Sequence, residues 1–393
     1  MDRQKLLIKN MKIYAENKKL HNGFIKIKDH IIEEIGTLDH LTTEEGYRIL
    51  DFSDKHVKAI PGLIDVHIHG ANGADVMDGT KQALQTMADT LPKEGTTSFL
   101  ATTMTQSNDD IEKAIKNAVS YMDQQHSGEA EIIGIHLEGP FINIKRKGAQ
   151  SEAHIKEPDI TLFQKWQQLA NKQIKLVTLA PEVNGGMEFI QHLKSQGIIA
   201  SAGHTDATAE QIKTAIKYGL SHITHLYNQM RGFHHREPGV VGAAWLQKEL
   251  MVEMIADGVH STPEAIQTAF ELKGKDRLLL ITDAMRAKCL HDGHYDLGGQ
   301  KVNVVEQKAR LDDGTLAGST LKLGDAMKNI IHFSGCTFEE AIAMTSANAA
   351  KELGMINRKG TIAEKKDADI VLLDDNNDIL LTLCRGEIAY ERM

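Results

Sequence analysis

The sequence predicts a (β/α)₈ TIM-type barrel joined to a small β-sandwich that is built from both ends of the chain. Its 393 residues are enough for one large domain and one small domain. The middle of the chain alternates short apolar runs with amphipathic helical stretches, a pattern typical of parallel strands connected by helices. Both ends instead carry closely spaced apolar runs separated by turn signals such as Asn22-Gly23.

The terminal runs indicate a small antiparallel sheet. Its expected strands are residues 6–8, 11–14, 24–28, 31–35, 368–373 and 379–383. Because the same pattern returns at the two ends around a different middle, we expect residues 1–57 and 359–393 to form one β domain. Residues 58–358 would then form the barrel.

Eight apolar runs in the middle of the chain are the expected barrel strands. They are residues 59–66, 97–101, 131–136, 174–180, 198–202, 221–224, 251–256 and 277–282. Helical periodicity separates several of them, at residues 81–91, 109–122 and 209–218. An open doubly wound sheet is the alternative, but no G-x-G-x-x-G follows the first strand, which argues against a dinucleotide-binding version.

Charge and composition exclude several classes of partner. The net charge is −9 and the longest Lys/Arg run is residues 145–147, so we expect no nucleic acid partner. No apolar run approaches the roughly 20 residues of a membrane span, and the first residues lack the apolar segment of a secretion signal. The three cysteines form no C-x-x-C pattern, which fits a cytoplasmic protein without structural disulfides.

His67 and His69 close the first expected strand. Side chains two apart on a strand point to the same face, so both imidazoles would project together and could form half of a metal site. With 19 histidines, chance alone gives roughly one His-x-His in the chain. The pair therefore gains meaning only if further ligands follow later strands.

Further candidate ligands do follow later strands. Glu138 comes after the third strand, His204 after the fifth, His225 after the sixth and Asp283 after the eighth. A barrel brings the carboxyl ends of its strands to one mouth, where barrel enzymes place their active sites. The sequence therefore predicts four imidazoles and two carboxylates that converge on one mouth and could bind metal.

The number of ligands predicts two divalent cations. Each needs about three protein ligands, and Glu138 can bridge both because its carboxylate has two oxygens. Asp283 then remains as a general base, with the alternative that it is one more ligand without a role in proton transfer. Mixed His/carboxylate ligands suit Zn, Fe, Mn or Co.

Eight short motifs resemble a known family. They are PGLIDVHIHG, HLEGPF, AGHTDA, THLYNQM, GVVGAAW, DGVH, TDAM and GTLAGS, and they run in order from residue 61 to residue 319. The spacing of the candidate ligands is similar to that of the amidohydrolase superfamily. Within it, the motifs together resemble the N-acetylglucosamine-6-phosphate deacetylase family.

The resemblance implies a role for each candidate ligand. Glu138, His204 and His225 match the family's common metal ligands, and His67 and His69 match the additional ligands of its two-metal members. Asp283 matches the catalytic acid/base. The implied reaction is hydrolysis of N-acetylglucosamine 6-phosphate to glucosamine 6-phosphate and acetate, in amino sugar breakdown. Metal-bound hydroxide would attack the acetamide carbonyl, while Asp283 acts as base and then as acid.

The resemblance also implies substrate contacts and a homodimer. Arg236 matches an arginine that reaches the substrate phosphate across a dimer interface. Gln150 stands where some members carry a histidine on the acetyl carbonyl, which a second metal could replace. The other matching positions are phosphate, sugar or acyl contacts: Ala149, Asn228, Gln229, His260, Leu316, Ala317 and Gly318.

Other interpretations remain open. A cyclic-amide hydrolase such as a hydantoinase or dihydroorotase resembles the same barrel, but bridges its metals with a modified lysine at the end of strand four, where this chain has only Lys175 at the opposite end. A non-catalytic scaffold would usually lack ligands, and all are present here. Arg236 could be a solvated surface residue and His260 a helix cap. No site role is assigned to His136, His222, His234 or His235.

Overall fold

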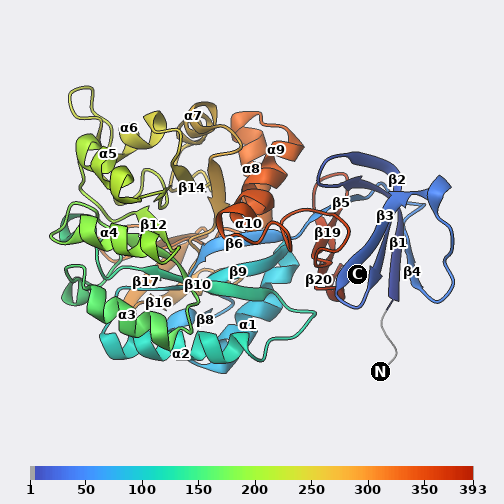
Figure 1. The fold of residues 1–393 in the computed structure, drawn as a ribbon, viewed down its shortest axis with the longest axis horizontal. Helices are drawn as coiled ribbons and strands as arrows, with labels where there is room; N and C mark the ends of the chain where they lie inside the picture. Colours follow the sequence, from blue (N-terminus) through green and yellow to red (C-terminus); the bar gives the residue numbers. More distant parts are fainter. Residues whose placement is uncertain (1–4, 393) are drawn as a thin grey trace.

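The computed structural model describes residues 5–392 and shows a barrel beside a smaller β domain (Figure 1). The barrel sheet has eight parallel strands in chain order, which confirms the predicted fold. These strands are β6 (Leu63–Ile68), β9 (Thr96–Thr103), β10 (Glu131–Glu138), β11 (Ile174–Leu179), β12 (Ile199–Ala202), β13 (His222–Ile223), β14 (Met251–Ile255) and β15 (Leu278–Ile281).

The barrel closes at the carboxyl ends of its first and last strands. A β-bridge joins Ile68 to Ala284. The backbone N–H of Asp283 donates to the carbonyl of His67 at 2.8 Å, and that of His69 to the carbonyl of Ala284 at 2.9 Å. Closure therefore occurs between candidate site residues and fixes their backbones together.

Helices surround the barrel, and several of them begin at polar capping residues. Thr80, Ser107 and Thr208 each accept a backbone N–H of the first turn that follows, which satisfies a donor that the helix cannot. The helices are α1 (Lys81–Thr90), α2 (Asn108–Met122), α3 (Ile160–Leu169), α4 (Gly186–Ser195), α5 (Ala209–Tyr218), α6 (Gly239–Leu246), α7 (Pro263–Lys273), α8 (Leu323–Ser334), α9 (Phe338–Ile342) and α10 (Asn348–Glu352).

The terminal strands form one continuous sheet around their own hydrophobic cluster. They are β1 (Lys5–Tyr14), β2 (Lys19–Lys28), β3 (Ile31–Thr37), β4 (Arg48–Asp51), β5 (Lys58–Pro61), β19 (Ile370–Leu373), β20 (Ile379–Cys384) and β21 (Glu387–Glu391). Most neighbouring strands pair antiparallel as expected, but β1 runs parallel to β4 and β5, so the sheet is mixed. The two strands expected over residues 6–14 are one strand, irregular at Asn10, whose φ is 65°.

The apolar run before His67 divides between the two domains. Lys58–Pro61 pairs with β19 and β1 in the terminal sheet, and the barrel strand begins only at Leu63. Gly62 lies at the change of direction, where an added Cβ would meet the Oγ1 of Thr97 at 2.1 Å. The terminal sheet therefore extends past the expected boundary at residue 58.

A small antiparallel sheet after the last barrel strand was missed by the sequence analysis. It comprises β16 (Gly293–Leu297), β17 (Gln300–Val305) and β18 (Lys308–Arg310) and packs on the barrel mouth through Leu297, Met104 and Met285. Its strands mix polar and apolar residues at the surface, so periodicity gave no clear signal.

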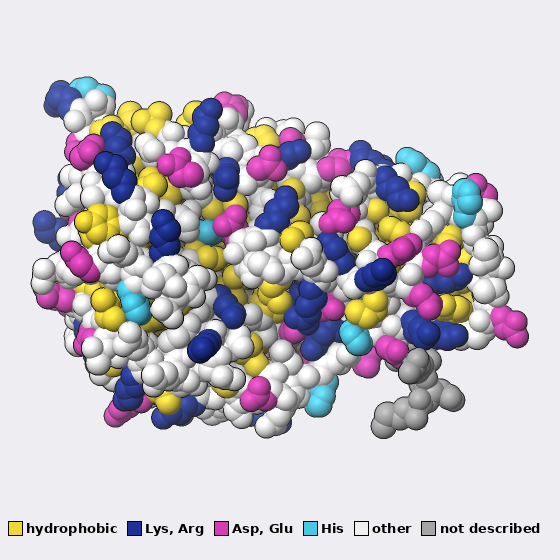
Figure 2. All heavy atoms as spheres, viewed as in Figure 1, with side chains coloured by type: hydrophobic (Ala, Val, Ile, Leu, Met, Phe, Trp, Pro, Cys, Tyr) yellow, Lys and Arg dark blue, Asp and Glu magenta, His cyan; other side chains and the backbone are white. Residues whose placement is uncertain are grey.

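The surface of the described residues is mixed in charge. Over the face drawn in Figure 2, basic and acidic side chains are interspersed rather than gathered into one basic surface. Among residues 5–392, no helix is long and apolar enough to cross a membrane. Cys289, Cys336 and Cys384 are unpaired.

Candidate active site

Four imidazoles at the barrel mouth are each fixed through Nδ1. The Nδ1 atoms of His69, His204 and His225 lie 3.3, 2.8 and 3.1 Å from backbone carbonyl oxygens. The Nδ1 of His67 lies 3.0 Å from the carboxylate Oε2 of Glu253. Oxygens of this kind only accept, so each Nδ1 carries the proton and each Nε2 of the neutral ring presents a lone pair.

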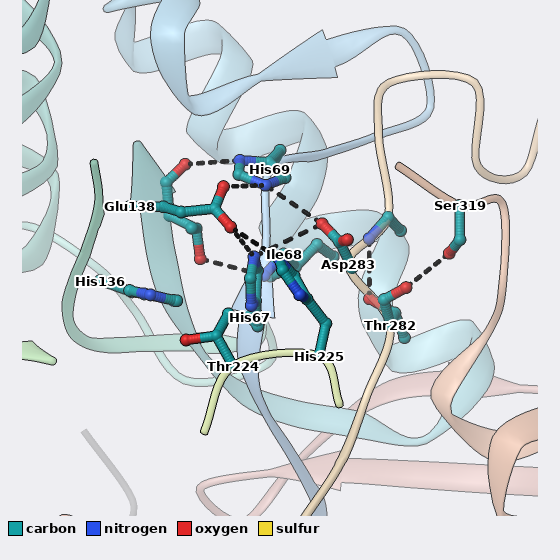
Figure 3. A network of polar contacts seen from close by, with 12 residues as sticks. His67, Ile68, His69, His136, Glu138, Thr224, His225, Thr282, Asp283 and Ser319 are labelled. Atoms are coloured by element: carbon teal, nitrogen blue, oxygen red, sulfur yellow. Dashed lines mark hydrogen bonds and ion pairs between the residues drawn. The ribbon is translucent and has the colours of Figure 1, made fainter. Parts of the chain in front are cut away.

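Glu138, the last residue of β10, lies where these Nε2 atoms converge. Its Oε1 is 3.3 Å from the Nε2 atoms of His67, His204 and His225, and its Oε2 is 3.3 Å from that of His69. Figure 3 shows His67, His69 and His225 turned toward this carboxylate. Two ligand sets share Glu138, one with His67 and His69 and one with His204 and His225.

The donor set of this site fits divalent cations. The Nε2 atoms of His204 and His225 are 3.2 Å apart, and with both Nδ1 protonated their lone pairs face each other and Glu138. Acceptors placed together in this way repel one another unless protons or a cation lie between them. Each set supplies three ligands, two imidazoles and the shared carboxylate, a number typical of zinc-like sites.

The pKa directions describe the same charge pattern. Burial alone would raise the pKa of Glu138, but the imidazoles of His67, His204 and His225 outweigh burial and hold this pKa well below its usual range. Burial would lower the pKa of His69, yet the carboxylates of Asp283 and Glu138 raise it to about 9. The pKa of His67 is likewise raised well above its usual value. Without a cation, these two rings therefore bind a proton at Nε2, the atom that a cation would occupy.

Asp283 faces the first ligand set. Its Oδ1 is 3.2 Å from the Nε2 of His69 and 3.4 Å from that of His67. Burial would raise the pKa of Asp283, but these two imidazoles outweigh it and lower the pKa to about 2. Asp283 is thus an anion near the predicted metal position, and its side chain stays partly exposed to the mouth.

Backbone strain is concentrated at the same positions. His204, His225 and Asp283 have φ values of 50°, 29° and 48°, in the left-handed region that non-glycine residues seldom adopt. Each such residue costs of the order of 1–3 kcal/mol and persists only where surrounding structure holds it. For Asp283, that support includes the N–H of Ser319, which donates to its carbonyl at 2.8 Å. Strain of this kind is frequent at active sites.

A pocket at the mouth gathers most of the predicted substrate contacts. The candidate residues that line it are His69, Glu138, Ala149, Gln150, His204, His225, Asn228, Gln229, His260, Asp283, Leu316 and Gly318. Ala317 is buried beside them, with its N–H donating to the carbonyl of Ala309 at 3.1 Å. Met104 and Leu297 also line the pocket and were not predicted.

Gln150 contacts the shared carboxylate directly. Its Nε2 donates to the Oε2 of Glu138 at 2.7 Å, and its Oε1 accepts the backbone N–H of Thr105 at 2.7 Å. The amide therefore orients Glu138 from the side of the first ligand set. This contact differs from the role of the histidine found there in some family members, which was the only role the sequence suggested.

His260 and Arg236 have different surroundings. The Nδ1 of His260 donates to Asp257 at 2.7 Å, which leaves its Nε2 for the pocket. Arg236 is exposed and lies outside the pocket of its own chain. It belongs to the segment between β13 and α6 that projects from the barrel in Figure 1, and its described side-chain contact is with the Nε2 of the neighbouring His235 at 2.9 Å.

Two buried polar residues complete the floor of the site. His136 lies between the carbonyl of Val66 and the hydroxyl of Thr178, and burial holds its pKa well below the usual value, so it is a neutral structural residue. Glu253 was missed. A charged residue within the apolar run of β14 is a signal that could have found it.

The lysine needed for a cyclic-amide hydrolase lies far from the site. Lys175 is near the start of β11, at the opposite end of the strand from the mouth, and its Nζ donates to the carbonyl of Lys172 at 3.2 Å. The strand ends near Thr178, whose hydroxyl contacts His136. The structure therefore argues against a lysine-bridged metal pair.

Comparisons with known proteins agree with this geometry. The model of the Amidohydrolase family matches residues 59–389. The N-acetylglucosamine-6-phosphate deacetylase of Bacillus subtilis is 47% identical over 389 residues, covering 98% of each chain. A mutant N-acetyl-D-glucosamine-6-phosphate deacetylase from Mycobacterium smegmatis, solved with N-acetyl-D-glucosamine-6-phosphate, aligns with a TM-score of 0.91 at 28% identity over 98% of this chain and 99% of that one.

A second solved relative extends the agreement. The N-acetylglucosamine-6-phosphate deacetylase of Thermotoga maritima aligns with a TM-score of 0.87 at 33% identity, over 98% of this chain and all of that one. The similarity thus spans the β domain as well as the barrel. The chain belongs to the amidohydrolase family and, within it, to the N-acetylglucosamine-6-phosphate deacetylases.

Proposed function

We propose that this protein hydrolyses N-acetylglucosamine 6-phosphate to glucosamine 6-phosphate and acetate in amino sugar breakdown. The observation that carries the proposal is the convergence of four lone-pair imidazole nitrogens on Glu138 at the barrel mouth. The relatives named for this deacetylation supply the substrate. We place the reaction in the cytoplasm, which agrees with the three unpaired cysteines.

Two divalent cations per chain are part of the proposal. Three carboxylates lie at the site, those of Glu138, Glu253 and Asp283, and no lysine or arginine among the described residues pairs with them. Three carboxylates with one divalent cation would leave the site with one negative charge. With two cations the site would carry one positive charge, which stabilises the negative charge that develops on a carbonyl oxygen under attack. Zn, Fe, Mn and Co all suit these ligands.

Different residues at the mouth would transfer the proton and bind the substrate. Bound divalent cations lower the pKa of water and polarise carbonyl oxygens. Asp283 accepts the proton of the attacking water at its carboxylate and returns it to the departing amine nitrogen. Its Oδ1 lies 3.2 Å from the Nε2 of His69, beside the ligands that would hold the cations. We assign His260, whose Nδ1 donates to Asp257, to substrate binding through its Nε2.

A homodimer would complete the phosphate site. Among the described residues that line the pocket, none is a lysine or an arginine. A phosphate dianion needs charge-assisted donors, and Asn228, Gln229 and His260 alone supply few. Arg236 is exposed and does not line the pocket of its own chain, and Phe233 in the same segment is 54% exposed. We propose that this segment reaches the pocket of a second copy and contributes Arg236 there.

The test combines metal analysis with acetate release. Protein loaded with excess divalent cation should contain near two equivalents, and a His67→Asn/His69→Asn variant near one. Acetate release should be fast from N-acetylglucosamine 6-phosphate and slower by at least 10² without the phosphate, since two charge-assisted bonds are lost. No acetate release from the phosphorylated sugar would overturn the activity. One equivalent in the wild type would overturn the two-metal proposal.

A further inference from the structure

Glu253 is a buried acid in an otherwise apolar strand. β14 has the sequence MVEMI, all five residues are buried, and Glu253 is 0% exposed. Burying a carboxylate is costly unless it is paired and hydrogen-bonded. Several other buried acids among the described residues have a basic partner, as Glu94 has Lys288 at 2.6 Å. Glu253 needs a different explanation.

The described contacts of the Glu253 carboxylate all involve the metal site. Its Oε2 accepts the Nδ1–H of His67 at 3.0 Å and the backbone N–H of His225 at 3.4 Å. Within residues 5–392, its Oε1 has no hydrogen-bond partner and no lysine or arginine forms an ion pair with it. Among the described residues, the only side chain bonded to the Glu253 carboxylate is therefore a candidate metal ligand.

His67 differs from the other three imidazoles in this respect. Their Nδ1 atoms donate to neutral backbone carbonyls, those of Thr102, Arg146 and Asn228. A carboxylate partner makes a ring more electron-rich than a carbonyl does, so its free nitrogen is a stronger ligand. It also fixes the tautomer in which Nε2 faces the cation.

We propose that Glu253 is a positioning residue that sets the affinity of the His67, His69 and Glu138 ligand set for its cation. It aligns His67, strengthens it as a ligand, and adds the negative charge that offsets a second cation beside Glu138. Within the described part of the chain, the Nδ1 atoms of His204 and His225 donate to backbone carbonyls and not to a carboxylate, and this set contacts Glu253 only through the backbone N–H of His225. The two sets should therefore respond differently to loss of Glu253. This inference rests on the two-cation site of the proposed function.

The test is a titration of metal-free protein with Zn²⁺ against a competing chelator. Glu253→Gln keeps the shape and an amide oxygen for the Nδ1–H but removes the charge. We expect the equivalent held by His67, His69 and Glu138, which the His67→Asn/His69→Asn variant lacks, to bind about 10–100-fold less tightly than in the wild type. The other equivalent should change by less than about threefold. Glu253→Asp, which restores the charge on a shorter side chain, should recover part of the affinity.

Glu131→Gln is the matched control. Glu131 starts β10 at the other end of the barrel, is also buried, and forms its described ion pairs with Arg358 and Lys359. This variant loses the same charge from a barrel strand and should keep both Zn²⁺ affinities. Absorption of the Co²⁺-loaded proteins gives a second readout. Compared with the wild type, the spectrum of Glu253→Gln should differ for only one of the two bound Co²⁺ equivalents.

The outcomes separate the two proposals. Two equivalents in the wild type with unchanged affinities in Glu253→Gln overturn the role of Glu253 alone. Equal weakening of both equivalents in Glu253→Gln shows general structural support and also overturns it. A wild type that binds two equivalents but releases no acetate overturns the proposed activity and leaves the role of Glu253 standing. A wild type with one equivalent overturns both the second cation and this role.

Discussion

Each end of β10 carries a buried glutamate, but the two carboxylates have different kinds of partner. Glu131, its first residue, lies 2.6 Å from the guanidinium of Arg358 and 2.7 Å from the ammonium of Lys359. Glu138, its last residue, has four imidazoles around it and no basic side chain with a permanent charge among its described partners. At one end the chain supplies its own cations. At the other it supplies ligands that need cations from outside.

The difference indicates what each end is for. We call the Glu131 end of the barrel, where its strands begin, the lower end, and the Glu138 end, where they finish, the upper end. The cluster around Glu131 joins the barrel to the terminal sheet, because Lys359 also contacts Asp367 and Asp369, just before β19. Burial would lower the pKa of Lys359, but Asp369, Glu131 and Asp367 outweigh it and raise this pKa, so the ammonium stays charged. The lower end is therefore a closed structural network. The upper end keeps unsatisfied charge and backbone strain, which are the features of a reaction site.

The largest expected effect is at the upper end. Asp283→Asn should retain both cations but lose roughly 10²–10⁴-fold or more in kcat, because the amide cannot accept the proton of the attacking water. The measurement is steady-state acetate release, with metal analysis of the same preparation. Loss of cation in parallel with activity would identify Asp283 mainly as a ligand, the alternative left open by the sequence.

At the lower end, we expect a substitution to reduce stability and to leave activity unchanged. Lys359→Met leaves three buried carboxylates with fewer partners and should lower the free energy of unfolding by about 3–5 kcal/mol, measured in urea. Where the variant is folded, its metal content and kcat should match the wild type. A loss below about 1 kcal/mol, or a loss of cation, would contradict the division between the two ends.

Sequence patterns predicted the upper end better than the lower one. The ligands were found because they directly follow apolar runs, and parallel strands carry such positions to one mouth. Glu253 escaped because its partner His67 is 186 residues away, and no local pattern reports a pairing at that distance. Lys359 and Glu131 are paired through the same kind of remote contact. The β16–β18 sheet was missed because its short strands lack a clear period.

A variant of Arg236 tests whether an arginine from a second copy of the chain completes the pocket at the upper end. The pocket offers no lysine or arginine among its described lining residues, so the substrate phosphate would depend on an arginine from a second copy. Arg236→Ala should lower kcat/KM for N-acetylglucosamine 6-phosphate by about 10–200-fold, the value of one charge-assisted bond of roughly 1.5–3 kcal/mol. Hydrolysis of the unphosphorylated sugar should hardly change. Arg48→Ala, an exposed arginine on β4, should affect neither sugar.

Mixed dimers then decide which copy uses Arg236. If the residue acts across the interface, a dimer of one Arg236→Ala subunit and one Asp283→Asn subunit has one site with both lesions and one with neither. Hybrids formed by unfolding and refolding the two variants together, and purified by two different tags, should therefore recover about half of the wild-type activity per dimer. If Arg236 serves its own subunit, each site in the hybrid carries one lesion and activity stays low. Equal losses on both sugars in the simple variant would instead show that Arg236 has a structural role.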